Sequence, residues 1–409
     1  MVQNKSFKKI PFTDFVFFQE GPGLRTTQWV NDGMKVINVK NIYDDGTVDI
    51  SNSDKFISLN EFEEKYSHFA VEVGDIVVAS SGNTYGKVGR VFQQHLPLMM
   101  NTSVIRFHSA DRSQLNDEYL YAFLRSPLFK AQIEQFVTGG AQPNFGPTHL
   151  KRMWITAPSI SVQTKIAENI SAYDSLIKNN QQRIKLLELS ARQMYKEWFV
   201  RLRFPGYEHT KIIKCVPEGW VKGTAFDFID VLSGGTPKTG VSDYWNGGIA
   251  FYTPKDSADN FYVIETDKTL SELGLSKCNS KLYPKDTIFI TARGTVGNLN
   301  LAQRPMAMNQ SCYAMKGKDD VTQLFLFCAI DAAINQFKQR ASGAVFDAII
   351  VDTFKLIPFL KPTKKFVLLF EEMMRPAFLQ IENLLIQNQK LKQARDLLLP
   401  KLMSGEITV

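Results

Sequence analysis

The stretch "IKNNQQRIKLLEL", residues 177–189, decides how this chain of 409 residues is organised. Its apolar residues recur at alternating steps of four and three, and this rhythm continues without a break over residues 166–198. Such heptad spacing is the pattern of a coiled coil. Adding 204 to each seam position gives a second, mostly apolar series over residues 370–402. The sequence therefore predicts two long helices whose apolar seams match.

One asparagine interrupts each seam. Asn180 is the fifth of ten layers in the first helix, and Asn388 is the sixth of ten in the second. The two amides would miss each other in a parallel pair but meet in an antiparallel one. An unpaired buried amide costs about 1–3 kcal/mol, whereas a mutual pair fixes the register. We predict an antiparallel coiled coil with Asn180 and Asn388 in contact; the alternative is that either side chain lies on the exposed rim.

The second helix has two further features. Pro376 interrupts its seam, so we expect the helix to kink or restart there. Phe378, Leu385 and Leu399 form an additional apolar stripe, which indicates another surface that must be covered. The sequence does not decide whether the chain's own globular parts or a partner protein cover it.

The chain also repeats itself outside the helices. The segment "VGDIVVASSGNTYGKVG" at residues 73–89 resembles "YPKDTIFITARGTVGNL" at 283–299, with Ser80 opposite Thr291. Upstream, "GMKVINVKN" resembles "GIAFYTPKD", which places Lys40 opposite Lys255. Each copy reads as short β-rich runs, then a helix, a glycine-containing loop and a long heptad helix.

We therefore expect an α+β protein with two homologous domains and two long helices that form an antiparallel coiled coil with pseudo-twofold symmetry. About 37 helical residues at about 1.5 Å each span roughly 55 Å, so the helices are expected to hold the domains at opposite ends. The predicted boundaries are 1–158 for the first domain, 159–203 for the first helix, 204–361 for the second domain and 362–409 for the second helix.

Composition narrows the function. The net charge of +7 and a pI near 9.0 favour a polyanionic partner such as nucleic acid. Scattered cysteines and histidines without CxxC or HExxH spacing predict no metal site, and the absence of GxxxxGKS, GxxxxGKT or a Rossmann fingerprint predicts no nucleotide cofactor. No apolar run is long enough for a membrane, and no secretory signal is evident, so we expect a reduced, cytoplasmic protein.

Three glycine-containing loops, together with Lys40 and Lys255, are candidates for DNA contacts. Polar side chains between glycines can approach base edges, and cations can contact phosphates. The alternatives are turns whose polar groups face water and lysines that are merely solvated. The candidates are Lys40, Ser81, Asn83, Thr84, Tyr85, Lys87, Arg90, Thr236, Lys238, Lys255, Thr291, Arg293, Thr295 and Asn298.

Several motifs, in order, resemble the specificity subunit of type I restriction–modification systems over essentially the whole chain. They are "TGGAQPNF" at 138–145, "MYKEWFVRLRFPG" at 194–206, the start of the second copy at 216–256 and "LLLPKLMSGEI" at 397–407. The second copy has "ASGAVFDAI" at 341–349 and lacks the equivalents of Gln142 and Asn144. The second domain therefore lacks the side chains for any DNA contact that Gln142 or Asn144 makes in the first domain.

The resemblance implies two target recognition domains, each reading one half of a split double-stranded DNA site. It also implies that the helices act as a ruler and dock two methyltransferase subunits, with restriction subunits joining indirectly. The chain by itself would be non-catalytic. The alternatives are a stand-alone bipartite DNA-binding protein, such as a repressor, and a structural spacer that binds proteins; missing motifs argue against a fused nuclease–methyltransferase. The target bases, the spacer length and the stoichiometry cannot be read from the sequence.

Overall fold

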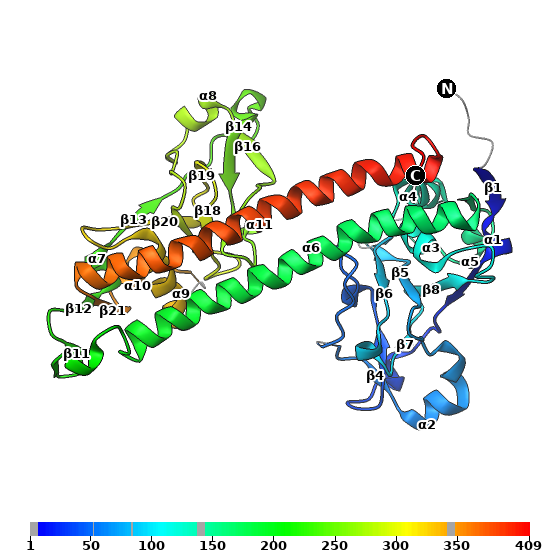
Figure 1. Cartoon of the computed structure of the whole chain (residues 1–409), viewed down its shortest axis with the longest axis horizontal. Coiled ribbons are helices and arrows are strands. Elements are labelled where there is room, and N and C mark those ends of the chain that lie inside the picture. The colour runs from blue at the N-terminus through cyan, green and yellow to red at the C-terminus, as the bar shows by residue number, and fades with distance from the viewer. Residues whose placement is uncertain (1–6, 52, 83–84, 137–143, 342–347) are drawn as a thin grey trace. The chain divides into compact units, whose positions relative to one another are not determined.

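The computed structural model describes residues 7–51, 53–82, 85–136, 144–341 and 348–409 (Figure 1). The chain divides into two compact units. Unit 1 comprises Met1–Leu176 and Leu391–Val409, and unit 2 comprises Ile177–Lys390. Each long helix contributes one part to each unit.

The two long helices are α6, Ile160–Tyr195, and α11, Lys364–Ser404. A wider helical turn, Lys196–Val200, extends α6 at its C-terminal end. α11 continues through Pro376, so the restart expected there is wrong. Proline removes one hydrogen bond from the helix, but Met374 and Phe378 on either side are buried and their packing keeps this segment helical.

Within each unit the helices are antiparallel, as predicted. In unit 2, Asn180 of α6 contacts Asn388 of α11, and Trp198 further along α6 packs on Phe370 near the start of α11. In unit 1, Asp174 of α6 pairs with Arg395 of α11. Most seam positions are buried: Ile166, Ile170, Ile177, Asn180, Ile184, Ala191 and Trp198 on α6, and Phe370, Met374, Ile381, Leu384, Asn388 and Leu402 on α11.

Unit 1 contains a four-stranded antiparallel sheet in the order β2-β8-β5-β6, a three-stranded sheet β4-β3-β7 and a strand pair β1-β9. The strands are β1 Lys8–Pro11, β2 Val16–Glu20, β3 Met34–Ile37, β4 Phe56–Ile57, β5 Ile76–Ala79, β6 Val88–Arg90, β7 Met99–Met100, β8 Val104–Ser109 and β9 Trp154–Ala157. The helices are α1 Phe12–Phe15, α2 Leu59–Glu61, α3 Asp117–Leu124, α4 Pro127–Phe136 and α5 Pro147–Leu150.

Unit 2 repeats this topology and adds one strand, β15, beside β18 and one further pair, β10-β11. Its sheets run β13-β20-β17-β18-β15 and β16-β14-β19, with β12-β21 and β10-β11 as pairs. The strands are β10 Ile212–Ile213, β11 Val216–Pro217, β12 Val221–Thr224, β13 Ile229–Ser233, β14 Trp245–Tyr252, β15 Tyr262–Val263, β16 Lys268–Leu270, β17 Ile288–Thr291, β18 Leu299–Ala302, β19 Met306–Met308, β20 Cys312–Gly317 and β21 Pro358–Lys361. The helices are α7 Ala225–Phe228, α8 Glu272–Ser276, α9 Gln323–Ala341 and α10 Val351–Phe354. Matching strand orders confirm that the chain contains two homologous α+β domains.

Backbone hydrogen bonds correct one detail of the repeat alignment. Ser80 accepts a hydrogen bond from Phe145, and Ala292 accepts the equivalent bond from Ile349. Ser80 therefore corresponds to Ala292, not to Thr291, and Ser81 corresponds to Arg293. The shift by one arises because the β5–β6 hairpin carries one residue more than the β17–β18 hairpin.

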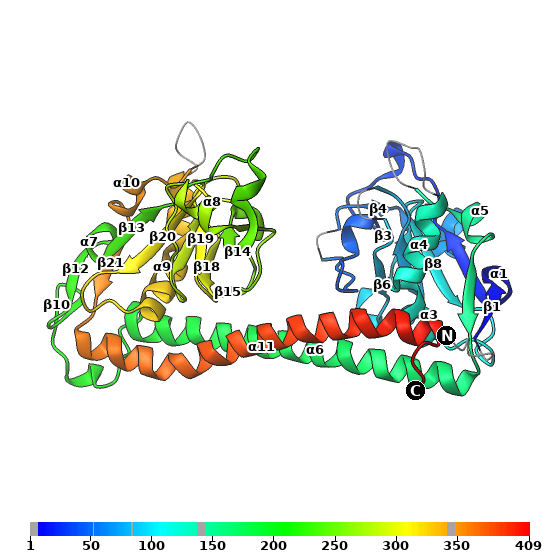
Figure 2. The same cartoon turned by 90° about the horizontal axis from the view of Figure 1, so that it is seen from above.

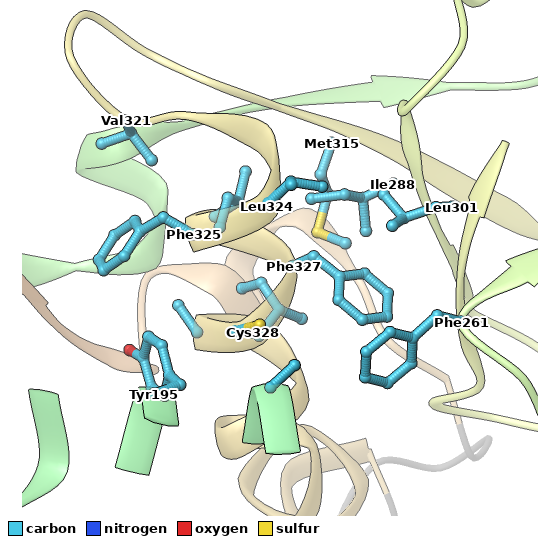
Figure 3. Packing of buried hydrophobic residues seen from close by; sticks show 14 of the residues in the cluster. Tyr195, Phe261, Ile288, Leu301, Met315, Val321, Leu324, Phe325, Phe327 and Cys328 are labelled. Carbon is cyan, nitrogen blue, oxygen red and sulfur yellow. The ribbon is translucent and has the colours of Figure 1, made fainter. Parts of the chain in front are cut away.

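The core of unit 2 forms around α9, which lies between the sheets and the helix pair (Figure 2). Phe325 and Cys328 of α9 lie toward Tyr195 of α6, whereas Phe327 lies toward the sheet (Figure 3). Phe325 also packs on Phe370 of α11, with ring centroids 6.2 Å apart. This buried aromatic layer joins the second domain to its segments of both long helices.

The chain itself covers the additional apolar stripe of α11. In unit 2, Phe378 is 1% exposed and its ring lies 5.2 Å from that of Phe261, and Leu385 packs against the same core. In unit 1, Leu399 is buried in the core of the first domain. The sequence left open whether the chain's own domains or a partner protein cover the stripe. The structure shows that the chain's own domains cover all three side chains.

Within the described ranges, none of the helices has the length and apolar character required to span a membrane. In the same part of the chain, no three His, Cys, Asp or Glu side chains gather closely enough to hold a metal ion.

Candidate nucleic-acid interface

In unit 2, several loops meet at the turn between β19 and β20, residues 309–311. Asn309 N donates to Tyr252 O at the end of β14, at 3.0 Å. Thr236 Oγ1 in the loop after β13 donates to Gln310 Oε1 at 2.5 Å. The hairpin between β17 and β18 joins the same turn through Arg293 N and Ser311 O, 3.3 Å apart. The ends of three strands are thus gathered at one edge of the domain.

The equivalent edge exists in unit 1. Asn101 N donates to Ile37 O at the end of β3, and Ser80 N donates to Ser103 O. The loop after β2 begins at Gly21, where an added Cβ would collide with the carbonyl oxygen of Asn101. Gly234 has the same relation to Asn309 in unit 2. A glycine is needed at both positions because the backbone passes directly over this turn.

These glycines pair the predicted Lys238 with a cation that the sequence comparison missed. Four residues after Gly21 lies Arg25, and four residues after Gly234 lies Lys238; both are exposed. The sequence does not indicate Arg25, because "GPGLRTT" and "SGGTPKT" share too few residues to establish an alignment. Only the shared packing of Gly21 and Gly234 shows that the two loops are equivalent.

The predicted residues of the β17–β18 hairpin divide into two groups. Arg293 and Thr295 are exposed at its tip. Thr291 is fully buried; its hydroxyl donates to Thr295 O and accepts from Asn298 N at 2.9 Å. Thr291 therefore holds the hairpin in shape and is not available to DNA, while Asn298 is half-buried.

Two further polar side chains lie at this edge in unit 2. Gln310 is exposed on the β19–β20 turn, where it accepts the hydrogen bond from Thr236. Lys338 near the end of α9 is exposed, and its aliphatic carbons lie against Gly297 in the hairpin. Neither residue was among the predicted contacts, since Lys338 reaches the hairpin from a helix about 40 residues later in the chain.

The hairpin of unit 1 offers fewer free cations. Arg90 is 15% exposed, forms an ion pair with Glu118 and lies 5.0 Å from the ring of Tyr121. Lys87 Nζ pairs with Asp44 at 3.0 Å. Glu118 and the ring of Tyr121 hold the Arg90 guanidinium inside the domain, whereas the side chain of Asp44 is 83% exposed and its pair with Lys87 is weak. We therefore give Arg90 a smaller part in any DNA contact than the sequence suggested.

The other predicted residues of this hairpin are uncharged, and two of them lie outside the described residues. Ser81 forms a bridge with Asn144, which brings the end of the "GGAQPNF" loop beside the hairpin. Tyr85 is half-buried against the core of unit 1. The predicted contacts Asn83 and Thr84, and the loop residue Gln142, lie outside the described residues.

Lys40 and Lys255 occupy equivalent exposed turns after β3 and β14. Lys40 Nζ lies 2.6 Å from Asp54, and Lys255 Nζ lies 3.1 Å from Asp267. The hydrogen bond from Lys40 lowers the pKa of the Asp54 carboxyl. Exposed ion pairs of this kind contribute little energy, so either lysine can exchange its aspartate for a phosphate.

Comparisons with known proteins identify the family of the two repeated domains. A family model described as the type I restriction modification DNA specificity domain matches residues 5–189 and 217–365. The chain is 25% identical over 300 residues to the MjaIX specificity subunit of Methanocaldococcus jannaschii, covering 71% of this chain and 69% of that one. It is 26% identical over 195 residues to the HindI specificity subunit of Haemophilus influenzae, covering 47% and 42%.

The fold is also similar to that of a solved structure. The S subunit of a type I restriction-modification system from M. genitalium matches with a TM-score of 0.57 and 18% identity, over 98% of each chain. At that identity the match supports the fold alone.

Proposed function

This chain belongs to the family of type I restriction modification DNA specificity domains and carries two copies of that domain, and from this premise we propose how it recognises DNA. Each unit reads one half of a bipartite double-stranded DNA site with the edge described above. Because the side chains at the two edges differ, the two half-sites differ and the whole site is asymmetric. We propose the boundaries predicted from the sequence as the limits of the two recognition domains and the two spacer helices.

The gathering of equivalent loops at one edge of each unit carries this proposal. Lys238 and Arg25, together with Lys40 and Lys255, supply cationic groups for phosphates. Arg293 and the polar side chains around it supply donors and acceptors for base edges. Protein–DNA interfaces need both kinds of contact, since phosphate contacts orient the protein and base contacts give specificity.

We further propose that the long helices dock two methyltransferase subunits, through which restriction subunits join. In unit 2, leucines lie exposed on both helices, including Leu186 of α6 at 65% and Leu379 of α11 at 52%. These leucines offer apolar surface on the helices that a partner protein can cover. The chain itself then contributes recognition rather than chemistry, and the complex works in the cytoplasm.

Methylome sequencing tests the DNA-reading proposal. A host that carries the whole system should methylate adenine in a split, asymmetric motif, and deletion of this chain should abolish that methylation. An unchanged methylome after deletion would contradict the proposal and favour a repressor or a structural spacer. Binding of the chain to duplex DNA separates these two, because phosphate contacts make affinity fall steeply with salt, whereas a spacer shows no such binding.

The docking proposal has a separate test. Leu186→Glu should reduce co-purification of methyltransferase subunits because it places a charge on the apolar contact. Gln181→Glu, which adds the same charge at another exposed position of α6, is the matched control. Equal recovery of the methyltransferase with both variants would contradict docking through Leu186.

A further inference from the structure

We infer that the half-site read by unit 2 contains a G·C pair whose guanine is contacted by Arg293, and that the equivalent position of unit 1 does not read guanine in this way. This inference rests on the proposed DNA-reading function and adds the chemistry of one base. It follows from the corrected alignment of the hairpins, which places Ser81 of unit 1 where unit 2 has Arg293.

The backbone of Arg293 is fixed. Ala292 N and Arg293 N both donate to Ser311 O, at 2.8 and 3.3 Å, and the buried Thr291 hydroxyl bridges the two sides of the hairpin. Gly294 and Gly297 provide the positive φ angles, +80° and +84°, that close the turn. A side chain presented from a rigid turn loses less entropy on binding, which suits a residue that must select one base.

The guanidinium of Arg293 is available to a ligand. Among the described residues, no hydrogen bond or ion pair engages it, and the side chain is exposed. Arg90 in unit 1 is the opposite case, since Glu118 and the ring of Tyr121 occupy its guanidinium. An arginine with both edges of its fork unoccupied can donate two hydrogen bonds to O6 and N7 of guanine, a pairing that no other base reproduces in the major groove.

Two exposed lysines, Lys338 and Lys238, lie on segments that join the Arg293 hairpin or the β19–β20 turn and are available for phosphate contacts. Lys338 lies against the hairpin at Gly297, and Lys238 belongs to the loop that Thr236 ties to Gln310. Two lysines on segments tied to the same edge as Arg293 match the division in which cations contact the phosphates and one guanidinium reads the base. At the equivalent place in unit 1, Ser81 offers one hydroxyl, which both donates and accepts and therefore discriminates weakly between bases.

The test compares the methylomes of hosts that carry the whole system with Arg293→Ala or Arg304→Ala. Arg304 is an exposed arginine beyond the opposite end of β18 and serves as the matched control. Arg293→Ala should relax one guanine in one half-site, with discrimination at that position falling by about 5- to 150-fold, and should leave the other half-site unchanged. Arg304→Ala should leave the motif unchanged.

A motif that Arg293→Ala leaves fully specified would overturn the inference while leaving the proposed function intact. Failure of the wild-type chain to direct any methylation would instead overturn the proposed function. If Arg293→Ala abolishes methylation altogether, the wild-type complex is tested on duplexes with 7-deazaguanine at each guanine in turn. The inference requires one guanine whose N7 is needed; a site in which no guanine is sensitive would refute it.

Discussion

Replacement of Asn180 and Asn388 by alanine, singly and together, tests the central layer of the helix pair. Asn180 is 1% exposed and Asn388 is 6% exposed. Asn180 Nδ2 donates to Asn388 Oδ1 at 2.9 Å and to Gln387 Oε1 at 3.0 Å, and Asn388 Nδ2 approaches Ile177 O at 3.4 Å. The contact predicted from the heptads is thus present; its role in setting the register remains a prediction.

The expected loss of stability follows from the burial of the two asparagine side chains. Asn180→Ala leaves Asn388 Oδ1 without this donor, and because water cannot readily reach it, unit 2 should lose about 1–3 kcal/mol of stability. Gln387 is exposed, so water can replace its lost bond at little cost. The double variant should cost about 1–2 kcal/mol less than the sum of the single variants, because the shared hydrogen bond can be lost only once.

Hydrogen exchange of the amides of α6 and α11 is the appropriate assay. The chain has two compact units, so a single two-state unfolding free energy is not well defined, whereas exchange reports local opening. Gln387→Ala serves as the control and should change stability by less than about 0.5 kcal/mol. Strictly additive single-variant energies would refute a coupled amide pair, and a helix pair in an altered register with Asn180→Ala would support the register role.

Three further predictions concern pH, salt and packing. Burial raises the pKa of Glu188, which accepts a hydrogen bond from Phe261 N, from 4.5 to about 7. Between these values the folded chain retains a proton that the unfolded chain releases, so stability should fall by up to roughly 3 kcal/mol as the pH rises through this window. Glu188→Gln should remove that fall in thermal melts between pH 5 and 8, and equal pH slopes would contradict the assignment. Lys238→Ala should weaken binding to all DNA sequences alike and reduce the slope of log affinity against log salt by about 1; an unchanged slope in titrations at several salt concentrations would show that Lys238 contacts no phosphate. Phe378→Ala should lower the stability of unit 2 by about 3–5 kcal/mol, measured by hydrogen exchange of the unit 2 amides, because Phe378 fills the core beside Phe261, whereas the exposed Leu379→Ala should change it by less than about 0.5 kcal/mol; comparable losses would mean that the stripe is not core.

Local pattern was sufficient to predict the helices and the repeat. Heptad spacing predicted both long helices, their antiparallel direction and the contact of Asn180 with Asn388. A seam must be apolar along its length, and the polar side chains buried in it must hydrogen-bond to each other. Internal similarity predicted two α+β domains, and the strand orders agree. These properties depend on residue spacing, which is visible in one dimension.

Tertiary structure alone decided which side chains are available at the reading edges. Arg90 looked free in the sequence, but Glu118, distant along the chain, holds it. Lys338 reaches its hairpin from the end of a helix, and Arg25 was recognised only through the packing of Gly21. Spacing along the chain determines which element a residue belongs to, whereas contacts between elements determine whether its charge is satisfied within the fold or left for a ligand.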